Sequence, residues 1–441
     1  MTPPTRHSTT FIIVVLALVL VDCESNDTPS LGDWTLQTDK LTLTETLRVS
    51  ETENYFFGSI QDLDATSTGR MVVLDADASH LKVLRPDGAL VDTLGRQGKG
   101  PGEFQGPTSV DVARGDSVYV FDNKPDRLTV FSLPLSSEPA RSAVVTSNVG
   151  NLSDVRVLGT RLIGEVTPGY TRKEGLYRPS PNTWYAFDGA NALGDPLLRV
   201  RRRKVATSFS GPGAAIDYLP FGRVTRVAAG PDGRLYHGFT DSLQLRATSP
   251  DGDTESIVSV SAPSVPVTAA ERDSVLSGID AEIRPLIEAE FPNSKPAFTD
   301  LVVTDDGRLW VRRPKSGPVA ETVVWWILDP DTKTIHEVQL PPAVDVEVVQ
   351  DGNAYGTTTT EEGAPAVVRY RIRTVPDANG PAMISFGHTS RIPLVLWSLE
   401  LLCGVFPGCG RNPSSSNLGD WTQQKEALTL TETHRRVEGT T

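Results

Sequence analysis

The stretch that decides the fold is Val118-Tyr119-Val120-Phe121-Asp122 together with Leu128-Thr129-Val130-Phe131, because a similar pair of runs occurs earlier in the chain. At a distance of 47 residues upstream stand Met71-Val72-Val73-Leu74-Asp75 and Leu81-Lys82-Val83-Leu84. Short runs of β-branched and other apolar residues, separated by Gly, Asp or Asn, are typical of strands joined by turns. Strands this short cannot bury both faces alone, so the repeat predicts small sheets that stack around a common axis.

Looser copies of this unit continue along the chain, at residues 152–187, 224–249, 299–328 and 345–372. The hairpins of the last three copies contain Asp-Gly pairs, as in Pro231-Asp232-Gly233-Arg234 and Asp305-Asp306-Gly307-Arg308. Glycine suits such turns because it adopts positive φ at little steric cost. The length accommodates six units, so we predict an all-β fold, a six-bladed β-propeller over residues 31–374.

The N-terminal strand of such a ring usually completes the last blade, which removes the open sheet edges. Residues 41–49 alternate leucines with Thr or Arg, as a half-buried strand does. We therefore expect this strand to pair with the sixth blade near residues 367–372.

The linker between the first two units is rich in glycine and reads Leu94-Gly95-Arg96-Gln97-Gly98-Lys99-Gly100-Pro101-Gly102-Glu103-Phe104. With Pro107 and Val110-Asp111-Val112 after it, this run resembles the inter-blade signature of NHL-repeat propellers, in particular exported bacterial six-bladed propellers of the lipoprotein type. It is not a phosphate-binding loop, because Lys99 precedes Gly-Pro instead of a Ser or Thr that opens a helix.

The hydrophobic period changes between the predicted fourth and fifth blades. Thr268-Ala269-Ala270-Glu271 is a capping box, and apolar residues recur after it at helical spacing. Pro285 is expected to kink or interrupt the helix near its end. We predict a helical insertion at about 268–291, which either covers the channel mouth as a lid or packs on the side of the propeller.

The N-terminus resembles a bacterial lipoprotein signal. Residues 11–21 are apolar, too short a run to span a bilayer but typical of a signal-peptide core. Cys23 follows, although Asp22 stands where such signals carry a small residue, and residues 24–30 form a polar tether. The resemblance implies a signal peptide over residues 1–23, lipidation of Cys23, and a periplasmic, outer-membrane or cell-surface protein that is held at the membrane by its lipid.

The C-terminal residues 375–441 do not continue the blade pattern. Leu418-Gly419-Asp420-Trp421-Thr422 repeats Leu31-Gly32-Asp33-Trp34-Thr35 at an offset of 387 residues. Residues 392–406 are apolar and precede a second candidate lipoprotein cysteine. Residues 383–441 therefore resemble the signal peptide and first strand of a tandem paralogue; the alternative is a C-terminal membrane anchor.

Composition limits the partners. The net charge is −13 and the pI is about 5.0, which disfavours binding to nucleic acid phosphates. The one basic run, residues 199–204, is either a solvated loop or a docking patch for an acidic partner. Residues 25–402 contain no cysteine, so the propeller has no disulfide framework and no cysteine-based metal site.

Candidate ligands for a metal come from the resemblance, since related six-bladed folds include calcium-dependent lactonases and esterases. Several acidic residues stand near predicted strand ends, among which we single out Asp75, Asp122, Asn123 and Asp300. Calcium requires six to eight converging oxygens. The six histidines show no zinc-ligand spacing and no Gly-x-Ser-x-Gly motif is present, so the sequence identifies no catalytic residue.

Aromatic residues in blades three to five are the best indication of binding. Trp184, Tyr236 and Trp310 are candidates to stack on a sugar or peptide at a channel mouth, the alternative being packing between blades. Together these features predict a noncatalytic binding or scaffolding propeller on the bacterial envelope, without a cofactor, for a protein, peptide or glycan ligand. The alternative is a calcium-dependent hydrolase or lactonase that acts at the central channel.

Overall fold

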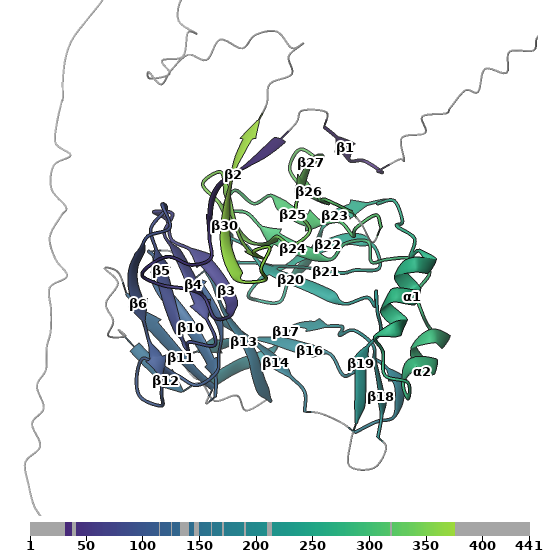
Figure 1. The fold of residues 1–441 in the computed structure, drawn as a ribbon, viewed down its shortest axis with the longest axis horizontal. Helices are drawn as coiled ribbons and strands as arrows, with labels where there is room; N and C mark the ends of the chain where they lie inside the picture. Colours follow the sequence, from purple (N-terminus) through teal and green to yellow (C-terminus); the bar gives the residue numbers. More distant parts are fainter. Residues whose placement is uncertain are drawn as a thin grey trace, which may run out of the picture. The chain divides into compact units, whose positions relative to one another are not determined.

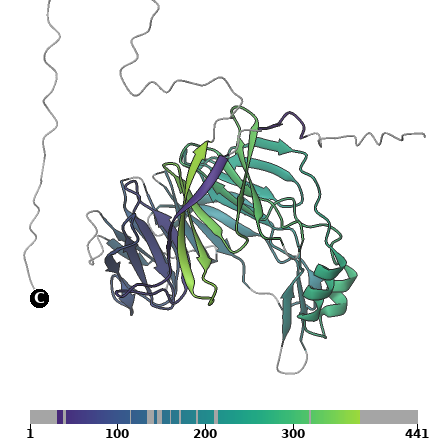
Figure 2. The same ribbon diagram turned by 45° about the horizontal axis from the view of Figure 1, so that its top comes forward.

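The computed structural model describes residues 31–374 except residues 38–40, 114, 125, 133–140, 145–149, 160, 170–171, 189–190, 210–213 and 318–319. In this part of the chain, strands form six sheets of at least four strands each, which follow one another in sequence (Figures 1 and 2). The predicted signal peptide with Cys23 and the tail from residue 375 lie outside the described residues.

Blades one and two use consecutive antiparallel strands, and blade three does so except that β15 (Gly175–Tyr177) leaves the sheet between its second and third strands. Blade one comprises β3 (Ile60–Ala65), β4 (Met71–Asp75), β5 (His80–Leu84) and β6 (Leu90–Leu94). Blade two comprises β9 (Pro107–Val112), β10 (Val118–Asn123), β11 (Asp126–Phe131) and β12 (Arg141–Val144). Blade three comprises β13 (Asn151–Leu158), β14 (Arg161–Thr167), β16 (Asn182–Asp188) and β17 (Asn191–Val200).

Blades four to six follow the same plan, except that the N-terminal strands join the last two. Blade four comprises β20 (Thr225–Ala229), β21 (Leu235–Phe239), β22 (Leu243–Thr248) and β23 (Thr254–Val260). Blade five comprises β24 (Asp300–Val303), β25 (Leu309–Arg312), β26 (Val323–Asp329), β27 (Thr334–Leu340) and β1 (Thr35–Leu36). Blade six comprises β28 (Asp345–Gln350), β29 (Asn353–Thr359), β30 (Pro365–Thr374) and β2 (Leu41–Val49).

The middle strands hold the ring together because they bury both faces. All of β4 is buried, and its side chains alternate between two clusters. Val72 and Leu74 pack with the apolar residues of blade two, whereas Met71 and Val73 pack with those of blade six. Each blade therefore supplies apolar side chains to both of its neighbours, which is why a single unit could not be stable alone.

The predicted ring closure is confirmed. Strand β2 pairs antiparallel with β30, and in this register Leu43 lies opposite Ile372 and Val49 opposite Val367. Strand β1, which the sequence did not predict, adds a short parallel pair to β27 of blade five. Beside it, the buried residues Leu31 and Trp34 pack into the apolar core that blades four and five share.

The glycine-rich linker between blades one and two is a turn, as predicted. Its residues form a two-stranded parallel pair, β7 (Arg96–Gln97) and β8 (Glu103–Phe104). Phe104 is fully buried, and a Cβ at Gly95 would lie 2.2 Å from its ring. Gly95 also has a φ of +82°, so both packing and backbone require glycine there.

The insertion between blades four and five contains two short helices, α1 (Ala269–Ser277) and α2 (Arg284–Ala289), where we expected one interrupted only near its end. The capping box of Thr268 and Glu271 is confirmed. The helix breaks at Gly278, which caps α1, and Pro285 lies in the first turn of α2, where proline is tolerated.

A three-stranded sheet lies outside the six blades, and the sequence did not predict it. It comprises β15 (Gly175–Tyr177), β18 (Val205–Ser208) and β19 (Ala215–Tyr218). Residues from both helices, including Leu276 and Ile287, share one apolar cluster with Ala206 and Leu219. The helices therefore pack on this side sheet (Figures 1 and 2), the second of the two placements that the sequence left open. No helix in the described part of the chain is both long and apolar enough to cross a membrane.

Candidate functional site

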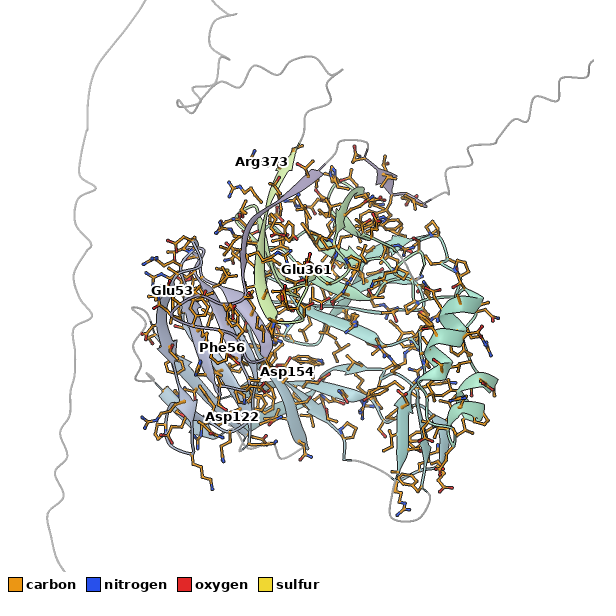
Figure 3. All side chains as sticks on the ribbon, viewed as in Figure 1. Glu53, Phe56, Asp122, Asp154, Glu361 and Arg373 are labelled. Atoms are coloured by element: carbon orange, nitrogen blue, oxygen red, sulfur yellow. The ribbon has the colours of Figure 1, made fainter. Side chains whose placement is uncertain are left out.

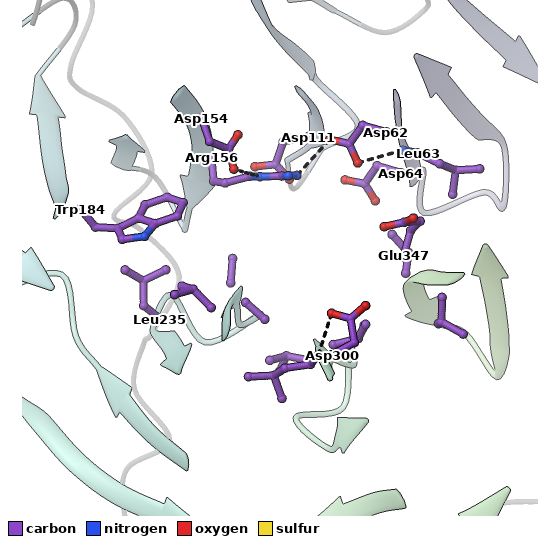
Figure 4. Close-up of a pocket in the computed structure, with 18 residues that line it drawn as sticks. Asp62, Leu63, Asp64, Asp111, Asp154, Arg156, Trp184, Leu235, Asp300 and Glu347 are labelled. Atoms are coloured by element: carbon purple, nitrogen blue, oxygen red, sulfur yellow. Dashed lines mark hydrogen bonds and ion pairs between the residues drawn. The ribbon is translucent and has the colours of Figure 1, made fainter. Parts of the chain in front are cut away.

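The first strand of each blade lines a central cavity. Consecutive first strands contact one another from β3 through β9, β13, β20, β24 and β28, and β28 contacts β3, so these strands form a closed ring. All six contribute residues to one cavity of about 340 Å³ (Figure 4). Its acidic residues are Asp62, Asp64, Asp111, Asp154, Asp300 and Glu347.

Strand geometry explains why the carboxylates gather here. On β3, Asp62 and Asp64 alternate with the buried Leu63 and Ala65, so both carboxylates lie on one face of the strand. Asp111 occupies the position of Asp64 in the next repeat, 47 residues further on. The closed ring brings these residues together with acids from blades three, five and six.

Three of the carboxylates connect neighbouring blades. Asp62 accepts a hydrogen bond from the backbone N–H of Val110 at 2.9 Å, and Asp64 accepts one from Val112 at 2.6 Å. Asp111 accepts the equivalent bond from the N–H of Val157 on blade three. These N–H groups lie on the open edges of inner strands, so the carboxylates satisfy donors that no neighbouring strand reaches.

Among the described residues, Arg156 is the single basic residue that lines the cavity. Its Nε lies 3.1 Å from Asp154 and its Nη1 lies 3.3 Å from Asp62 (Figure 4). Burial alone would lower the pKa of Arg156, but the charges of Asp154, Asp62 and Asp111 raise it well above its ordinary value. The guanidinium therefore stays charged and compensates only part of the negative charge around it.

The uncompensated carboxyl groups have raised pKa values. Burial is the main cause, and the charges of neighbouring acids add to it. The pKa of Asp64 lies well above its usual value because the residue is buried and because the charge of Asp111 raises the pKa further. The pKa of Asp111 rises to about 6 and that of Glu347 to about 8, the latter also through Asp62 and Asp300. Glu347 is exposed, but the surface that it exposes faces the central cavity, which the six inner strands enclose.

Two polar atoms at the cavity have no partner within the described structure. The indole Nε1 of Trp184 is buried without an acceptor, and the residue is only 5% exposed. The Oδ1 atom of Asp154 is likewise buried without a donor. Buried polar atoms are nearly always satisfied in native proteins, so both atoms are available to a bound molecule or to water.

The four singled-out metal ligands are not brought together. Only Asp300 lines the central cavity. Asp75 is fully buried in blade one, where it accepts hydrogen bonds from the N–H groups of Gly58 and Ser59 and pairs with Lys82 at 2.5 Å.

Asp122 occupies the equivalent position in blade two. It accepts hydrogen bonds from the N–H groups of Gln105, Gly106 and Lys124 (Figure 3 labels the residue). Asn123, the last residue of β10, is exposed. Asp75 and Asp122 therefore support the turns between strands, and their oxygens are already used.

The residues do not fit a calcium site. Within the described residues, no group of three or more His, Cys, Asp or Glu side chains is arranged so that it could hold a metal ion. In the central cavity, both oxygens of Asp62 and of Asp64 and one oxygen of Asp111 accept hydrogen bonds from backbone N–H groups. Arg156 places a positive charge among them. A metal would have to displace these contacts to gather the six to eight oxygens that calcium needs.

The three aromatic candidates lie in different environments. Trp184 lines the central cavity. Tyr236 faces a groove between the Asp-Gly hairpins of blades four and five, and its hydroxyl donates to Asp232 at 2.9 Å. Trp310 is 1% exposed and packs against Trp325 with ring centroids 6.2 Å apart, so it cannot stack on a ligand and the packing alternative holds for it.

Sequence reasoning missed Asp154, Arg156 and Glu347. Asp154 and Arg156 stand two residues apart on β13, the same alternation that places Asp62 and Asp64 on one face of β3. That spacing was the available signal. It could not be used because the repeat is weak in blades three and six, so the register of their inner strands was not fixed.

Comparisons with known proteins agree with this architecture. The model of a family described as a 6-bladed beta-propeller matches residues 39–151. The chain is a six-bladed β-propeller. No curated protein matches the sequence.

Three solved structures illustrate the likeness. A candidate exported protein from Bacteroides fragilis shares 14% identity over 78% of this chain and 98% of its own, with a TM-score of 0.46. A gluconolactonase from Xanthomonas campestris shares 13% identity over 78% and 99%, with a TM-score of 0.37. A streptogramin B lyase shares 11% identity over 76% and 98%, also with a TM-score of 0.37. These proteins are distant, and none of their activities is transferred to this propeller.

Proposed function

We propose that this propeller is a noncatalytic binding protein of the bacterial envelope whose central cavity takes the positively charged group of a ligand, such as a basic peptide or an amino sugar. The observation that carries the proposal is the set of six carboxyl groups around a single arginine. Without a ligand, several of these groups have raised pKa values because burial and mutual repulsion disfavour their charged forms.

A cation in the cavity would reverse this effect. A positive charge within about 4–6 Å of a carboxyl group favours its ionised form and lowers its pKa. At pH 7 Glu347, with a pKa of about 8, is mostly protonated and would release its proton as the ligand binds, whereas Asp111, with a pKa of about 6, is already mostly ionised. Proton release is therefore a signature of this site that a surface contact would not produce.

The test is calorimetric titration of the full chain with tri-lysine at pH 7 in two buffers of different ionisation enthalpy. The proposal expects binding with proton release, and weaker binding for Glu347→Gln together with smaller proton release. A peptide of three norleucines, which keeps the hydrocarbon side chain of lysine without its ammonium group, is the control. Equal binding of both peptides, or binding without proton release, would contradict the proposal.

The envelope location rests on the N-terminal sequence alone. Cys23→Ser should move the protein from the membrane fraction to the soluble fraction, because the lipid would no longer be attached. A membrane fraction that stays unchanged would contradict lipidation at Cys23 and would point to residues 392–406 as the anchor.

The rival proposal is a calcium-dependent hydrolase or lactonase at the same cavity. One observation favours catalysis in general: a carboxyl group with a pKa of about 8, that of Glu347, carries a proton at neutral pH and so has the state of a general acid. Metal analysis separates the two proposals. Bound calcium at unit stoichiometry, with lactone hydrolysis that is lost on chelation, would favour the enzyme and overturn the noncatalytic reading.

A further inference from the structure

A second pocket, of about 310 Å³, lies on the side sheet and is independent of the central cavity. Its walls come from β15, β18 and β19 and from the segments next to them. The residues that matter are Lys173, Tyr177, Arg178, Arg202, Ile216 and Tyr218. Ile216 and Tyr218 are each 51% exposed, which is unusual for large apolar side chains of this protein.

The pocket is basic in an acidic protein. Among the ion pairs of the described residues, none involves Lys173, Arg178 or Arg202. Glu165 interacts electrostatically with Arg202, and its carboxylate also accepts a hydrogen bond from Ser153 at 3.0 Å. Three cations therefore surround one small pocket on a chain whose net charge is −13.

The fold holds these cations in place. The guanidinium of Arg178 donates to the backbone carbonyls of Arg202 and Arg223, so it is fixed without an acidic partner. Burial lowers the pKa of Arg178, and the nearby charge of Arg201 lowers it further. The Nζ of Lys173 lies 4.8 Å from the centre of the Tyr177 ring, which positions the ammonium group beside an aromatic wall.

We propose that this pocket binds an acidic sugar, a uronic acid residue of a glycan. The cations match the carboxylate, since Arg and Lys donate charge-assisted hydrogen bonds to it. Tyr177, Tyr218 and Ile216 offer an apolar wall for the C–H face of a sugar ring. A bare phosphate would use the cations and leave that wall uncovered. The volume lies at the lower end of small-molecule pockets, which span about 300–1,000 Å³.

The basic run at residues 199–204 thus has two environments. Arg202 lines the pocket, whereas Arg199, at the end of β17, is exposed and does not line it. The two residues provide a matched pair, because Arg199→Gln and Arg202→Gln change the net charge equally and only Arg202 lines the pocket.

The experiment is titration of the purified full chain with tri-galacturonic acid, with neutral galactotriose and with inorganic phosphate. We expect the acidic trisaccharide to bind more tightly than the other two, and Arg202→Gln to weaken its binding about ten- to hundredfold, as the loss of a charge-assisted hydrogen bond does. Arg199→Gln should leave the affinity within about twofold. Tyr218→Ala should weaken binding of the acidic trisaccharide but leave phosphate binding unchanged. Thermal unfolding of each variant shows that it is folded.

Three results would overturn the proposal. If galactotriose binds as tightly as the acidic sugar, the cations play no part. If Arg199→Gln weakens binding as much as Arg202→Gln, the interaction is general electrostatic attraction. If phosphate binds as tightly and Tyr218→Ala has no effect, the pocket is an anion site without sugar recognition. None of these results depends on the central cavity, so failure here leaves the proposed function standing.

Discussion

The hydroxyl of Tyr370 donates a hydrogen bond of 2.9 Å to the carboxylate of Glu45, although 325 residues of chain separate the two. The bond links β30 to β2 and so joins the two ends of the propeller. Around it, Leu47 and Val49 of β2 pack on the apolar cluster between blades one and six. Closure therefore combines strand pairing, this hydrogen bond and apolar burial.

Deletion of residues 31–50 should lower the melting temperature strongly, because it removes both β1 and β2. The buried Trp34 is lost as well, and loss of a buried tryptophan side chain alone costs about 3–5 kcal/mol. Truncation after Thr374 should leave the melting temperature unchanged. Thermal unfolding followed by circular dichroism measures both.

The tail sequence supplies a control for that experiment. Residues 428–433 repeat residues 41–46, but His434 and Arg436 stand where Leu47 and Val49 would follow. The tail copy should therefore not rescue the deletion of residues 31–50. A lower melting temperature after truncation at Thr374 would mean that the tail closes the ring and that the paralogue interpretation is wrong.

Asp75→Asn should destabilise the protein more than Asp122→Asn, although the two residues occupy the same position of the repeat. In blade one the change leaves the ammonium of Lys82, whose side chain is 7% exposed, without its partner. Breaking a buried ion pair in this way costs about 3–5 kcal/mol. In blade two the position of Lys82 is taken by Thr129, so Asp122→Asn should cost about 1–3 kcal/mol. Urea denaturation of both variants measures the difference, and equal losses would show that Lys82 contributes little.

Arg156→Met should lower the free energy of unfolding at pH 7 by about 2–3 kcal/mol. The value lies below the 3–5 kcal/mol of a fully buried pair because the Arg156 side chain is 32% exposed. The loss should shrink at pH 5, since Asp111, with a pKa of about 6, takes up a proton there and no longer repels the neighbouring carboxylates. Denaturant unfolding at both pH values tests this, and a loss that is the same at both would exclude the electrostatic explanation.

Glu347→Gln should change how stability depends on pH. Between about pH 4.5 and 8, folded Glu347 keeps a proton that the unfolded chain releases, so its contribution is complete below pH 4.5 and is lost as the pH rises through 8. Glutamine resembles the protonated form and does not titrate. The melting temperature of the wild type should therefore fall relative to that of Glu347→Gln as the pH rises from 5 to 8. Parallel curves would mean that the pKa of Glu347 is not raised.

The sequence allowed the propeller and its closing strand to be predicted because these depend on local patterns. The alternation in β4 and the repeat at 47 residues are visible in the residues themselves. The side sheet was missed because β15 interrupts blade three between β14 and β16, so its strands match no period of the repeat.

The central site could be predicted only in part. The sequence pattern predicts Asp300 as a site residue, and Asp300 does line the cavity. The same kind of pattern also selects Asp75 and Asp122, which instead accept hydrogen bonds from backbone N–H groups of turns. An aspartate at a strand end can line the cavity or accept hydrogen bonds from a turn. Which carboxylates lie in the cavity depends on how the ring of blades closes. For the same reason, Glu347 of blade six lies in one cavity with Asp62 of blade one, a contact that no local pattern specifies.

Because β2 is the first long strand to be synthesised and the last to be paired, the order of synthesis matters for this protein. At about 5–20 residues per second, the 325 residues between Glu45 and Tyr370 take roughly 15–65 seconds to appear. Throughout that time the ring has no closing strand, and the edge of its newest blade is open to other chains. Folding that begins only after synthesis is complete would avoid this delay, because both strands of the closing pair would then be present when pairing starts.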